Sequence, residues 1–280
     1  MLYRKNENSF SIIIPSYNQG KFLKDCLESL HSQDYDNFEI IIMDSLSTDN
    51  TPEIVKYYKN RYKKITHFIR KKDNGQSDAI NKGIKYSKNE WISWQNCDDL
   101  YANNQVLNKF NQTIKKNLYK KLIVGNINLV DKDLKKIRDL KYVKPNFYSL
   151  LYEEMTLTNQ AAFWNRSVHN KIGYLNNYRL NFDYEWFLRI LKNFPNCGVN
   201  LNYDCGIYRI HGQQKTKIQS EKDFNLKREI KISYGYSKKY LIFKKIFLNL
   251  RRTILFCLDG NFYYVLRGLF SFLLNKKKYP

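Results

Sequence analysis

The stretch that decides the fold runs from residue 10 to residue 44 and reads FSIIIPSYNQGKFLKDCLESLHSQDYDNFEIIIMD. It contains two apolar, β-branched runs, residues 10–15 and 38–44, which predict buried strands. Between them, the spacing of the apolar residues predicts an amphipathic helix with these residues facing the core: Phe22, Leu23, Cys26, Leu27 and Leu30. A strand, a helix and a second strand make a crossover unit, so this segment predicts a parallel sheet.

The alternation of strands and helices continues, and the pattern changes after about residue 120. Further strands are predicted at 65–69 and 91–95, and further helices at 51–60, capped by Thr51, and at 76–87. Beyond residue 120 the sequence predicts strand pieces at 122–131, 137–143 and 205–212, and a helix at 181–194. We therefore expect an α/β fold with a Rossmann-like, mostly parallel sheet flanked by helices. In such sheets, ligands bind beyond the carboxyl ends of the strands.

Positive charge is the strongest signal in the composition. The 280 residues include 48 Lys and Arg against 26 Asp and Glu, for a formal net charge of +22. Such an excess favours anionic partners, namely nucleic acid, acidic lipid or phosphorylated ligands. A chain rich in Lys, Asn, Ile and Tyr is also typical of a biased genome composition, so the charge alone does not identify the partner.

Cysteines and apolar runs indicate the compartment. The five cysteines are scattered and include no CxxC pair, which favours a reducing cytosol and excludes an obvious zinc site. The first residues lack the apolar region of a cleavable signal. No run approaches the roughly 18–20 apolar residues of a membrane span. We expect a cytoplasmic protein.

Acidic and amide side chains gather where the predicted strands end. These are Asp44 after the second strand, Asp78 in the helix that follows the third, and Asn96, Asp98 and Asp99 after the fourth. The loops at one end of a parallel sheet share an edge, so these side chains are expected to converge. Two adjacent carboxylates repel each other unless a cation or hydrogen-bond donors offset them, and Mg²⁺ or Mn²⁺ prefers oxygen ligands. Turn and helix-cap roles are the alternative.

Five segments, in order, carry a resemblance to a known family. They read SIIIPSYNQGKFLKDCLESLHSQDYDNFEIIIMDSLSTDNT, DNGQSDAINKGIKYSKNEWISWQNCDDLY, TNQAAFWNRS, NFDYEWFLR and YRIHGQQKT. Their order and spacing resemble the family 2 glycosyltransferases over roughly residues 9–216. These are inverting enzymes of the GT-A fold that use nucleotide-sugar donors. The second and fourth segments are most similar to bacterial enzymes that build surface polysaccharides.

The resemblance implies roles on the donor side of the site. Pro15, Tyr17 and Asn18 match the loop beside the nucleotide, and Asp44 matches the residue that binds the base or ribose. Asp78 matches a donor-side position. The following residues match the end of the aspartate motif that holds ribose, diphosphate and a Mn²⁺ or Mg²⁺ ion: Asn96, Asp98 and Asp99. His211 matches a late residue near the diphosphate or the metal.

The resemblance also implies the acceptor side. Asp183 matches the catalytic base, and Glu185 is a helix neighbour that shares the role. The tryptophans of the chain favour the core, but Trp164 and Trp186 flank this segment, so one of them, with Trp164 as the candidate, is expected to stack on a sugar ring. The acceptor hydroxyl attacks the anomeric carbon in a single inverting displacement while Asp183 takes its proton and a nucleoside diphosphate leaves. The implied acceptor is lipid-linked or a polysaccharide.

Three departures from the family pattern affect these roles. Ser45 and Leu46 stand where the family often has an acidic residue and a glycine. Asn96 opens the aspartate motif in place of Asp, so metal binding is expected to depend mainly on Asp99. Phe182 precedes Asp183 where the family is often acidic.

The C-terminal segment combines apolar helices with basic residues. From residue 216 to residue 280 the sequence predicts basic amphipathic helices, with a polar stripe of Lys244, Lys245, Asn249, Arg251 and Arg252. We expect this tail to lie on the inner face of the cell membrane, with Lys and Arg on anionic head groups. Packing on the catalytic domain, or a dimer contact, is the alternative.

The sequence thus predicts two regions and one main function. Residues 1–215 form the catalytic domain, with a nucleotide-sugar half at about 1–125 and an acceptor half at about 126–215. A nucleotidyltransferase shares the sheet and the acidic site, but its first loop is typically rich in Gly, Arg and Lys, unlike PSYNQGKF. A basic nucleic-acid-binding protein is the other alternative. Against nucleic acid, the basic residues of the tail alternate with long apolar runs.

Overall fold

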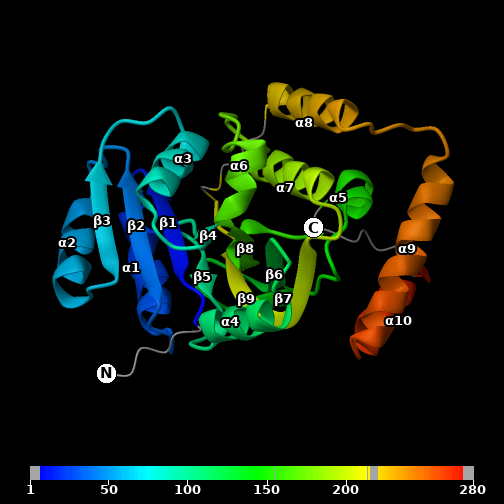
Figure 1. Cartoon of the computed structure of the whole chain (residues 1–280), viewed down its shortest axis with the longest axis horizontal. Helices are drawn as coiled ribbons and strands as arrows, with labels where there is room; N and C mark the ends of the chain where they lie inside the picture. Colours follow the sequence, from blue (N-terminus) through cyan, green and yellow to red (C-terminus); the bar gives the residue numbers. More distant parts are fainter. Residues whose placement is uncertain (1–6, 155, 213, 215–219, 274–280) are drawn as a thin grey trace.

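The computed structural model describes residues 7–154, 156–212, 214 and 220–273 of the chain. Within these residues, nine strands form one sheet in the order β3-β2-β1-β4-β8-β6-β9-β5, with β7 paired to β6 (Figure 1). The strands are β1 (Phe10–Ser16), β2 (Phe38–Asp44), β3 (Ile65–Arg70), β4 (Trp91–Trp94), β5 (Leu100–Tyr101), β6 (Leu122–Val130), β7 (Lys136–Leu140), β8 (Ala162–Asn165) and β9 (Gly198–Arg209).

The first part of the sheet is parallel, as the sequence predicts, and the second part is mixed. Strands β3, β2, β1 and β4 run parallel to one another. Strand β8 is antiparallel to both of its neighbours, β4 and β6, and β5 is antiparallel to β9. The α/β class is confirmed, and every antiparallel pair among the described strands includes at least one strand that follows residue 95.

Helices cover both faces of the sheet. They are α1 (Gly20–His31), α2 (Thr51–Arg61), α3 (Gln76–Tyr86), α4 (Val106–Lys116), α5 (Phe147–Glu153), α6 (His169–Ile172), α7 (Phe182–Asn193), α8 (Glu221–Ser233), α9 (Leu241–Leu258) and α10 (Phe262–Leu273). Helices α1, α2 and α4 share one apolar core with the sheet, and α3, α5, α6 and α7 share the other. Two short 3₁₀ helices flank β8, at Asn159–Ala161 and Arg166–Val168.

Burial on both faces explains why the strand sequences are continuously apolar. In β1, Ile12 and Ile14 enter the core under α1, whereas Ile13 enters the core under α3. Successive side chains of a strand point to opposite faces, so a strand covered by helices on both sides needs apolar residues at every position. The predicted inward residues of α1 are all buried, and Ala79, Ile80, Gly83 and Ile84 of α3 are buried as well.

The start of α2 differs from the expectation. Thr51 is the first residue of the helix rather than its cap, and Asn50 holds the cap position. The carboxylate of Asp49 accepts a hydrogen bond of 3.0 Å from the backbone N–H of Thr51. Asp49 therefore satisfies the free amide that a capping side chain normally serves.

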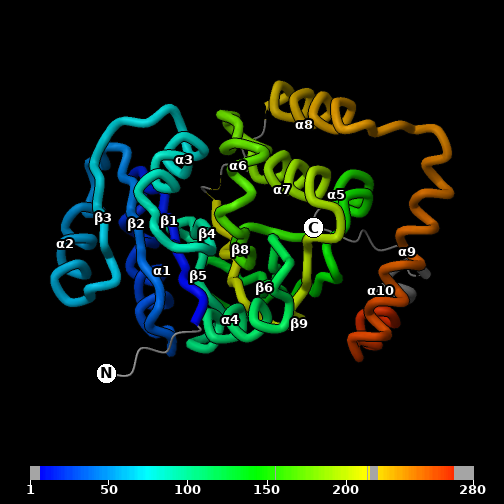
Figure 2. The backbone as a smooth tube through the Cα atoms, viewed as in Figure 1, coloured from blue at the N-terminus to red at the C-terminus, as the bar shows by residue number. Residues whose placement is uncertain are grey.

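The C-terminal segment is helical, as predicted, and packs on the rest of the chain. Helix α8 contacts α7, and α9 and α10 follow along the end of the molecule opposite β3 (Figure 2). A search of the described helices finds no candidate membrane span. Three lysines of the predicted basic end, Lys276, Lys277 and Lys278, lie outside the described residues.

Trp164 lies in the core and corrects one expectation. Its side chain is 0% exposed and packs edge-on against Trp94 and Trp186. A ring with no exposed face is not available to stack on a sugar. The apolar surroundings of β8 account for its position better than a substrate role does.

His169 is held as a neutral imidazole beside this tryptophan cluster. The indole N–H of Trp164 donates to His169 Nε2 at 2.9 Å, and His169 Nδ1 donates to the carbonyl of Gly173 at 2.8 Å. An indole only donates and a carbonyl only accepts, so these two bonds fix a single neutral tautomer. Burial lowers the pKa of His169 to about 4, although the bond to Gly173 opposes the shift.

The free energy of unfolding should therefore decrease as the pH is lowered through the titration of His169. The imidazole charges near pH 6.5 in the unfolded chain but only near pH 4 in the folded one, so its contribution is complete above pH 6.5 and is lost as the pH falls below it. Between about pH 7 and pH 4 we expect a loss of about 2–3 kcal/mol from this group. Urea unfolding of the wild type and of His169→Gln at several pH values measures it. Equal slopes in the two proteins would contradict the assignment.

Candidate active site

The carboxyl ends of the first three strands are level with one another. The register pairs Ser16 of β1 with Asp44 of β2, and Asp44 with Arg70 of β3. The loop after β4 lies along the same edge, since the amide of Gln95 donates to the carbonyl of Ile13 at 2.9 Å. The edge predicted from the sequence to hold the polar residues therefore exists.

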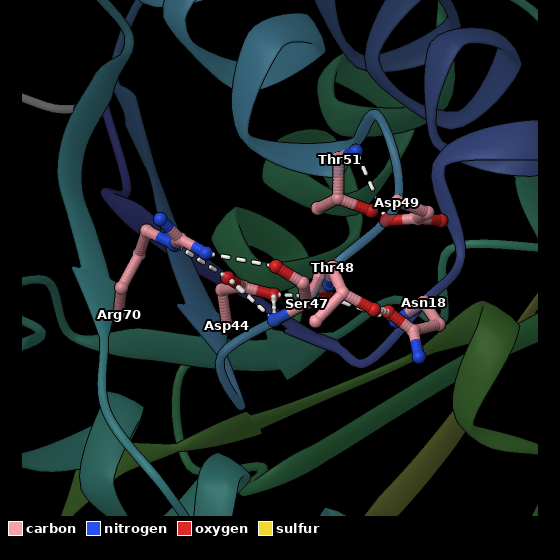
Figure 3. Close-up of polar contacts among 7 residues, drawn as sticks. All are labelled: Asn18, Asp44, Ser47, Thr48, Asp49, Thr51 and Arg70. Atoms are coloured by element: carbon pink, nitrogen blue, oxygen red, sulfur yellow. Dashed lines mark hydrogen bonds and ion pairs between the residues drawn. The ribbon is translucent and has the colours of Figure 1, made fainter.

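Asp44 is the buried centre of a polar cluster at this edge (Figure 3). Its side chain is 0% exposed and accepts a 3.0 Å hydrogen bond from Nε of Arg70. The amide and hydroxyl of Ser47 also donate to its carboxylate. Arg70 in turn donates to the carbonyl of Ser47 at 2.8 Å. Arg70 is the accessible member of this pair, since 42% of its side chain is exposed.

The first loop is tied to the same cluster. The amide of Asn18 donates to Oγ of Ser47 at 2.8 Å, and its side-chain oxygen accepts from the amide of Thr48 at 2.9 Å. Asn18 has a φ of 51°, a left-handed conformation that asparagine tolerates better than most residues. Tyr17 beside it is 62% exposed, while Pro15 is buried in β1. Asn18 and Tyr17 thus line the edge, and Pro15 supports it from within the sheet.

Asp99 belongs to a chain of side-chain amides. Its carboxylate accepts hydrogen bonds of 2.8 Å from Asn96 and from Gln160, and Asn96 accepts one of 2.7 Å from Gln76. The other oxygen of Asp99 is buried and has no hydrogen-bond partner among the residues that the structure describes. Burial and then the charge of Asp98 raise the pKa of Asp99 well above its usual range, against the bonds from Gln160 and Asn96.

Asp98 and His211 meet across the site. Oδ2 of Asp98 lies 2.9 Å from Nε2 of His211, and the His211 ring stacks on Phe22 of α1 at 4.5 Å between centroids. His211 follows β9, so the contact joins the loop after β4 to the end of the late strand. Among the described residues, no group of three or more His, Cys, Asp and Glu side chains is arranged to hold a metal ion. Asp98 is the carboxylate beside His211, and a metal-ligand role for Asp99 stays a prediction.

Asp78 has a local structural role. Its carboxylate accepts from the amide of Asn74 at 2.8 Å and pairs with Lys82, one turn further along α3, at 2.7 Å. Burial alone would raise its pKa, but the bonds from Lys82 and Asn74 lower it overall. A donor-side role for Asp78 remains a prediction, and any contact with a ligand would compete with these bonds.

Asp183 lies in the first turn of α7, near the same edge. The adjacent Phe182 packs on Trp94, the last residue of β4, with 6.1 Å between ring centroids. Burial raises the pKa of Asp183, against hydrogen bonds from the backbone at Tyr184 and at Asp183 itself. A carboxylate with a raised pKa is a stronger base than an ordinary aspartate, which suits the predicted role.

Glu185 is occupied by neighbouring side chains. It is 3% exposed and accepts from the hydroxyl of Tyr234 at 2.6 Å and from Arg189 at 3.1 Å. These bonds join α7 to the residue that follows α8. The geometry favours Asp183 over Glu185 as a base, and a shared role for Glu185 remains a prediction.

Sequence reasoning gave no site role to three residues that the structure brings into it. Arg70 ends β3, Gln76 starts α3, and Gln160 lies in the 3₁₀ helix before β8. Each acts through a contact with a residue that was predicted, namely Asp44, Asn96 or Asp99. The only signal in the sequence was a polar residue at a predicted strand end or within a family segment.

Comparisons with known proteins identify the family of this chain. The family model Glycosyl transferase family 2 matches residues 11–187. An uncharacterized glycosyltransferase of Rickettsia felis is 32% identical over 49% of this chain and 22% of its own length. The glucosyltransferase WfgD of Escherichia coli, which acts on α-D-GlcNAc-diphosphoundecaprenol with UDP-Glc, is 26% identical over 78% of this chain and 83% of its own length. The chain spans less than half the length of the first curated relatives that it matches.

Solved structures share the fold. Staphylococcus aureus TarS, in complex with UDP-GlcNAc, has a TM-score of 0.65 and 19% identity over 83% of this chain and 69% of its own. The mannosyltransferase PcManGT of Pyrobaculum calidifontis, in complex with GDP-Man and Mn²⁺, has a TM-score of 0.55 and 13% identity over 97% of this chain and 88% of its own. The family model matches more than half of the 280 residues, and the chain belongs to glycosyl transferase family 2.

Proposed function

We propose that this chain is an inverting glycosyltransferase that moves a sugar from a nucleotide-diphosphate sugar to a hydroxyl of a lipid-linked or polysaccharide acceptor in bacterial surface glycan synthesis. The observation that carries the proposal is the single sheet edge that brings the Asp44 cluster level with the loop of Asp98, which contacts His211. Family membership and the acceptor of WfgD support the same conclusion.

The donor would bind across this edge in two parts. The base and ribose would lie against Arg70, Asn18 and Tyr17, where Asp44 orients the guanidinium from beneath. The diphosphate would lie toward Asp98 and His211, next to the ring of Phe22. Between these two parts, Asn96 and Asp99 would hold the loop after β4 in place through their hydrogen bonds with Gln76 and Gln160.

A divalent cation fits the donor set at Asp98 and His211. A carboxylate oxygen and an imidazole nitrogen suit Mn²⁺ or Mg²⁺, and substrate phosphates usually complete the coordination of such ions. When bound, the ion would supply positive charge to the diphosphate leaving group. Asp99, the next residue on this loop, would be the second carboxylate available to such an ion, whose positive charge would favour its ionised form.

The transfer step would use Asp183 as the base. The acceptor oxygen attacks the anomeric carbon, the bond from that carbon to the diphosphate oxygen breaks, and the hydroxyl proton passes to the carboxylate of Asp183. Attack on the face opposite the leaving group inverts the anomeric centre. The burial that raises the pKa of Asp183 makes the carboxylate a better proton acceptor.

The two alternative functions predict different products. A nucleotidyltransferase would release pyrophosphate from a nucleoside triphosphate, and family membership argues against it. A nucleic-acid-binding protein would bind duplexes in a salt-dependent manner and hydrolyse no nucleotide sugar. A panel of nucleotide sugars, scored by slow donor hydrolysis, separates all three.

We also infer the division of the chain and its location. Residues 1–215 would form the catalytic domain and 216–280 a basic helical tail. The protein would act in the cytoplasm, peripherally on the inner face of the cell membrane, where a lipid-linked acceptor is available.

Metal dependence should be measurable by nucleotide binding. With Mn²⁺ present, the affinity for a nucleoside diphosphate should rise, and removal of the metal with a chelator should reverse the gain. Asp98→Asn should weaken the metal-dependent binding by about a hundredfold or more. Residues that only support metal ligands typically cost about ten- to a hundredfold when they are changed, and a ligand should cost more. Calorimetry measures the affinities.

The matched control is Asp133→Asn, which changes an exposed carboxylate in the turn between β6 and β7. It should bind metal and nucleotide as the wild type does. Equal Mn²⁺ dependence in Asp98→Asn and wild type would remove Asp98 from the metal site without affecting the rest of the proposal.

Asp183→Asn should abolish transfer and leave donor binding intact. The amide is close in size to the carboxylate but accepts no proton, and loss of a general base typically costs about 10²–10⁴-fold in rate. Transfer is measured by release of the nucleoside diphosphate with a lipid-linked or sugar acceptor.

Glu185→Gln serves as the comparison on the same helix. It should lower thermal stability, since it weakens the contacts with Arg189 and Tyr234, and reduce the transfer rate much less than Asp183→Asn does. A larger rate loss in Glu185→Gln than in Asp183→Asn would instead assign the base to Glu185.

A further inference from the structure

Helix α9 turns its basic residues toward the body of the protein. Lys244 donates to the hydroxyl of Tyr152 at 2.9 Å, and Arg252 pairs with Glu153, both residues of α5. Arg251 donates to the carbonyl of Lys144 at 3.0 Å. The sequence predicts these side chains on lipid head groups, and the structure corrects this expectation by giving them protein partners.

The turn between α9 and α10 is fixed as well. Nδ2 of Asn202 in β9 donates to the carbonyl of Asp259 at 3.2 Å, and Nδ2 of Asn261 donates to Oδ1 of Asn202 at 3.0 Å. Leu248 and Phe256 of α9 are buried on the same side as the basic residues. The two helices therefore attach to the rest of the chain through one defined face.

The opposite face of α9 is apolar and open. Its members recur at helical spacing and include Leu258 at 77%, Ile242 at 73% and Phe243 at 71% exposure. The full set of exposed apolar residues on the two helices is Ile242, Phe243, Ile246, Phe247, Leu250, Ile254, Leu258, Phe262, Tyr263 and Leu266. We name this set the outer apolar face. Apolar patches of this kind mark protein or membrane contacts.

The surroundings of the outer apolar face are basic. Lys238, Lys239 and Lys245 are exposed near the start of α9, where Tyr240 is also exposed. From residue 230 to residue 280 the sequence has eleven Lys and Arg residues and one acidic residue, Asp259. Such charge complements an anionic surface, and tyrosine favours the boundary between water and lipid.

We propose that the outer apolar face rests on an anionic lipid bilayer, with α9 and α10 lying along its surface. The apolar side chains would enter the region between head groups and acyl chains, and Lys238, Lys239 and Lys245 would contact anionic head groups. A second copy of the chain fits less well, because facing copies would bring like charges together. This inference assigns a defined surface to the membrane association of the proposed function. It rests on that function only for the choice of a lipid partner.

The attached tail contacts the segment that carries the candidate base. The hydroxyl of Tyr234, just after α8, donates to Glu185 of α7, and Asn181 donates to the carbonyl of Asp223 at 3.0 Å. Asp183 lies between these two contacts along the chain. A bilayer bound to α9 and α10 would thus be linked through α8 to the acceptor side, where a lipid-linked substrate arrives.

Vesicle flotation of the full-length protein tests the surface. Wild type should float with vesicles of phosphatidylcholine and phosphatidylglycerol. Phe243→Ser, Phe247→Ser and Leu250→Ser together should lower the bound fraction about tenfold or more, since three exposed apolar side chains are lost from the contact. The matched control, Phe224→Ser with Ile232→Ser, changes exposed apolar residues of α8 and should float as the wild type does.

Two sets of charge variants separate the roles of the basic residues. Lys238→Gln, Lys239→Gln and Lys245→Gln together should lower flotation several-fold on anionic vesicles and have little effect on phosphatidylcholine alone. Lys244→Gln with Arg252→Gln should leave flotation nearly unchanged and lower the thermal midpoint, because both residues hold α9 against α5. Loss of flotation in this last pair equal to that of the apolar variant would overturn the assigned orientation.

The remaining outcomes also decide the proposal. Wild type that stays with the soluble fraction, or an apolar variant that floats normally, would reject the lipid surface. A concentration-dependent dimer in sedimentation without vesicles, absent from the apolar variant, would assign the face to a second copy instead. Donor hydrolysis measured on the same samples without vesicles tests the proposed function separately, since it does not depend on flotation.

Discussion

The register of β1, β2 and β3 is the constraint on which the site depends. It sets Ser16, Asp44 and Arg70 level, so a carboxylate with no exposed surface meets a guanidinium from the next strand. A buried carboxylate is costly unless several donors satisfy it. Here Arg70 and Ser47 supply them, and the loop of Ser47 then holds the loop of Asn18. A shift of one residue in this register would move the side chain of Asp44 to the opposite face of the sheet, away from Arg70. The loops of Ser47 and Asn18 would then lose their contact.

Helices and strands of the first half follow from the sequence because their signals are local. The buried positions of α1 repeat along one face, and β-branched runs covered on both sides leave little choice of structure. The mixed second half is less predictable, since the pairing of β8 with β4 and β6 joins segments about seventy and forty residues apart in the chain. No local pattern sets such a pairing. Trp164 is an example, because the sequence around a tryptophan near a functional segment does not show whether the ring faces the core or a substrate.

The candidate site is also only partly predictable from the sequence. Family segments indicate Asp98, Asp99, Asp183 and His211, but only the fold distinguishes their surroundings. Asp99 is bonded to two amides, whereas the adjacent Asp98 meets His211 from the far end of β9. The two neighbouring carboxylates have different hydrogen-bond partners, so adjacency in sequence does not give them the same surroundings. The sequence does not identify Gln160 as a partner of Asp99, because their contact depends on the pairing of β8.

The amphipathic pattern of α9 shows why a helix alone does not identify its own inner face. Spacing separates a basic stripe from an apolar one, and either stripe is able to face the protein. The acidic and polar groups of α5 decide the outcome, since Glu153 and Tyr152 offer partners to Arg252 and Lys244 that water or lipid would otherwise provide. Once these charges are paired within the protein, the apolar stripe has no covering in the described part of the chain. The electrostatic contact that stabilises the tail is therefore also what exposes the surface available to a membrane.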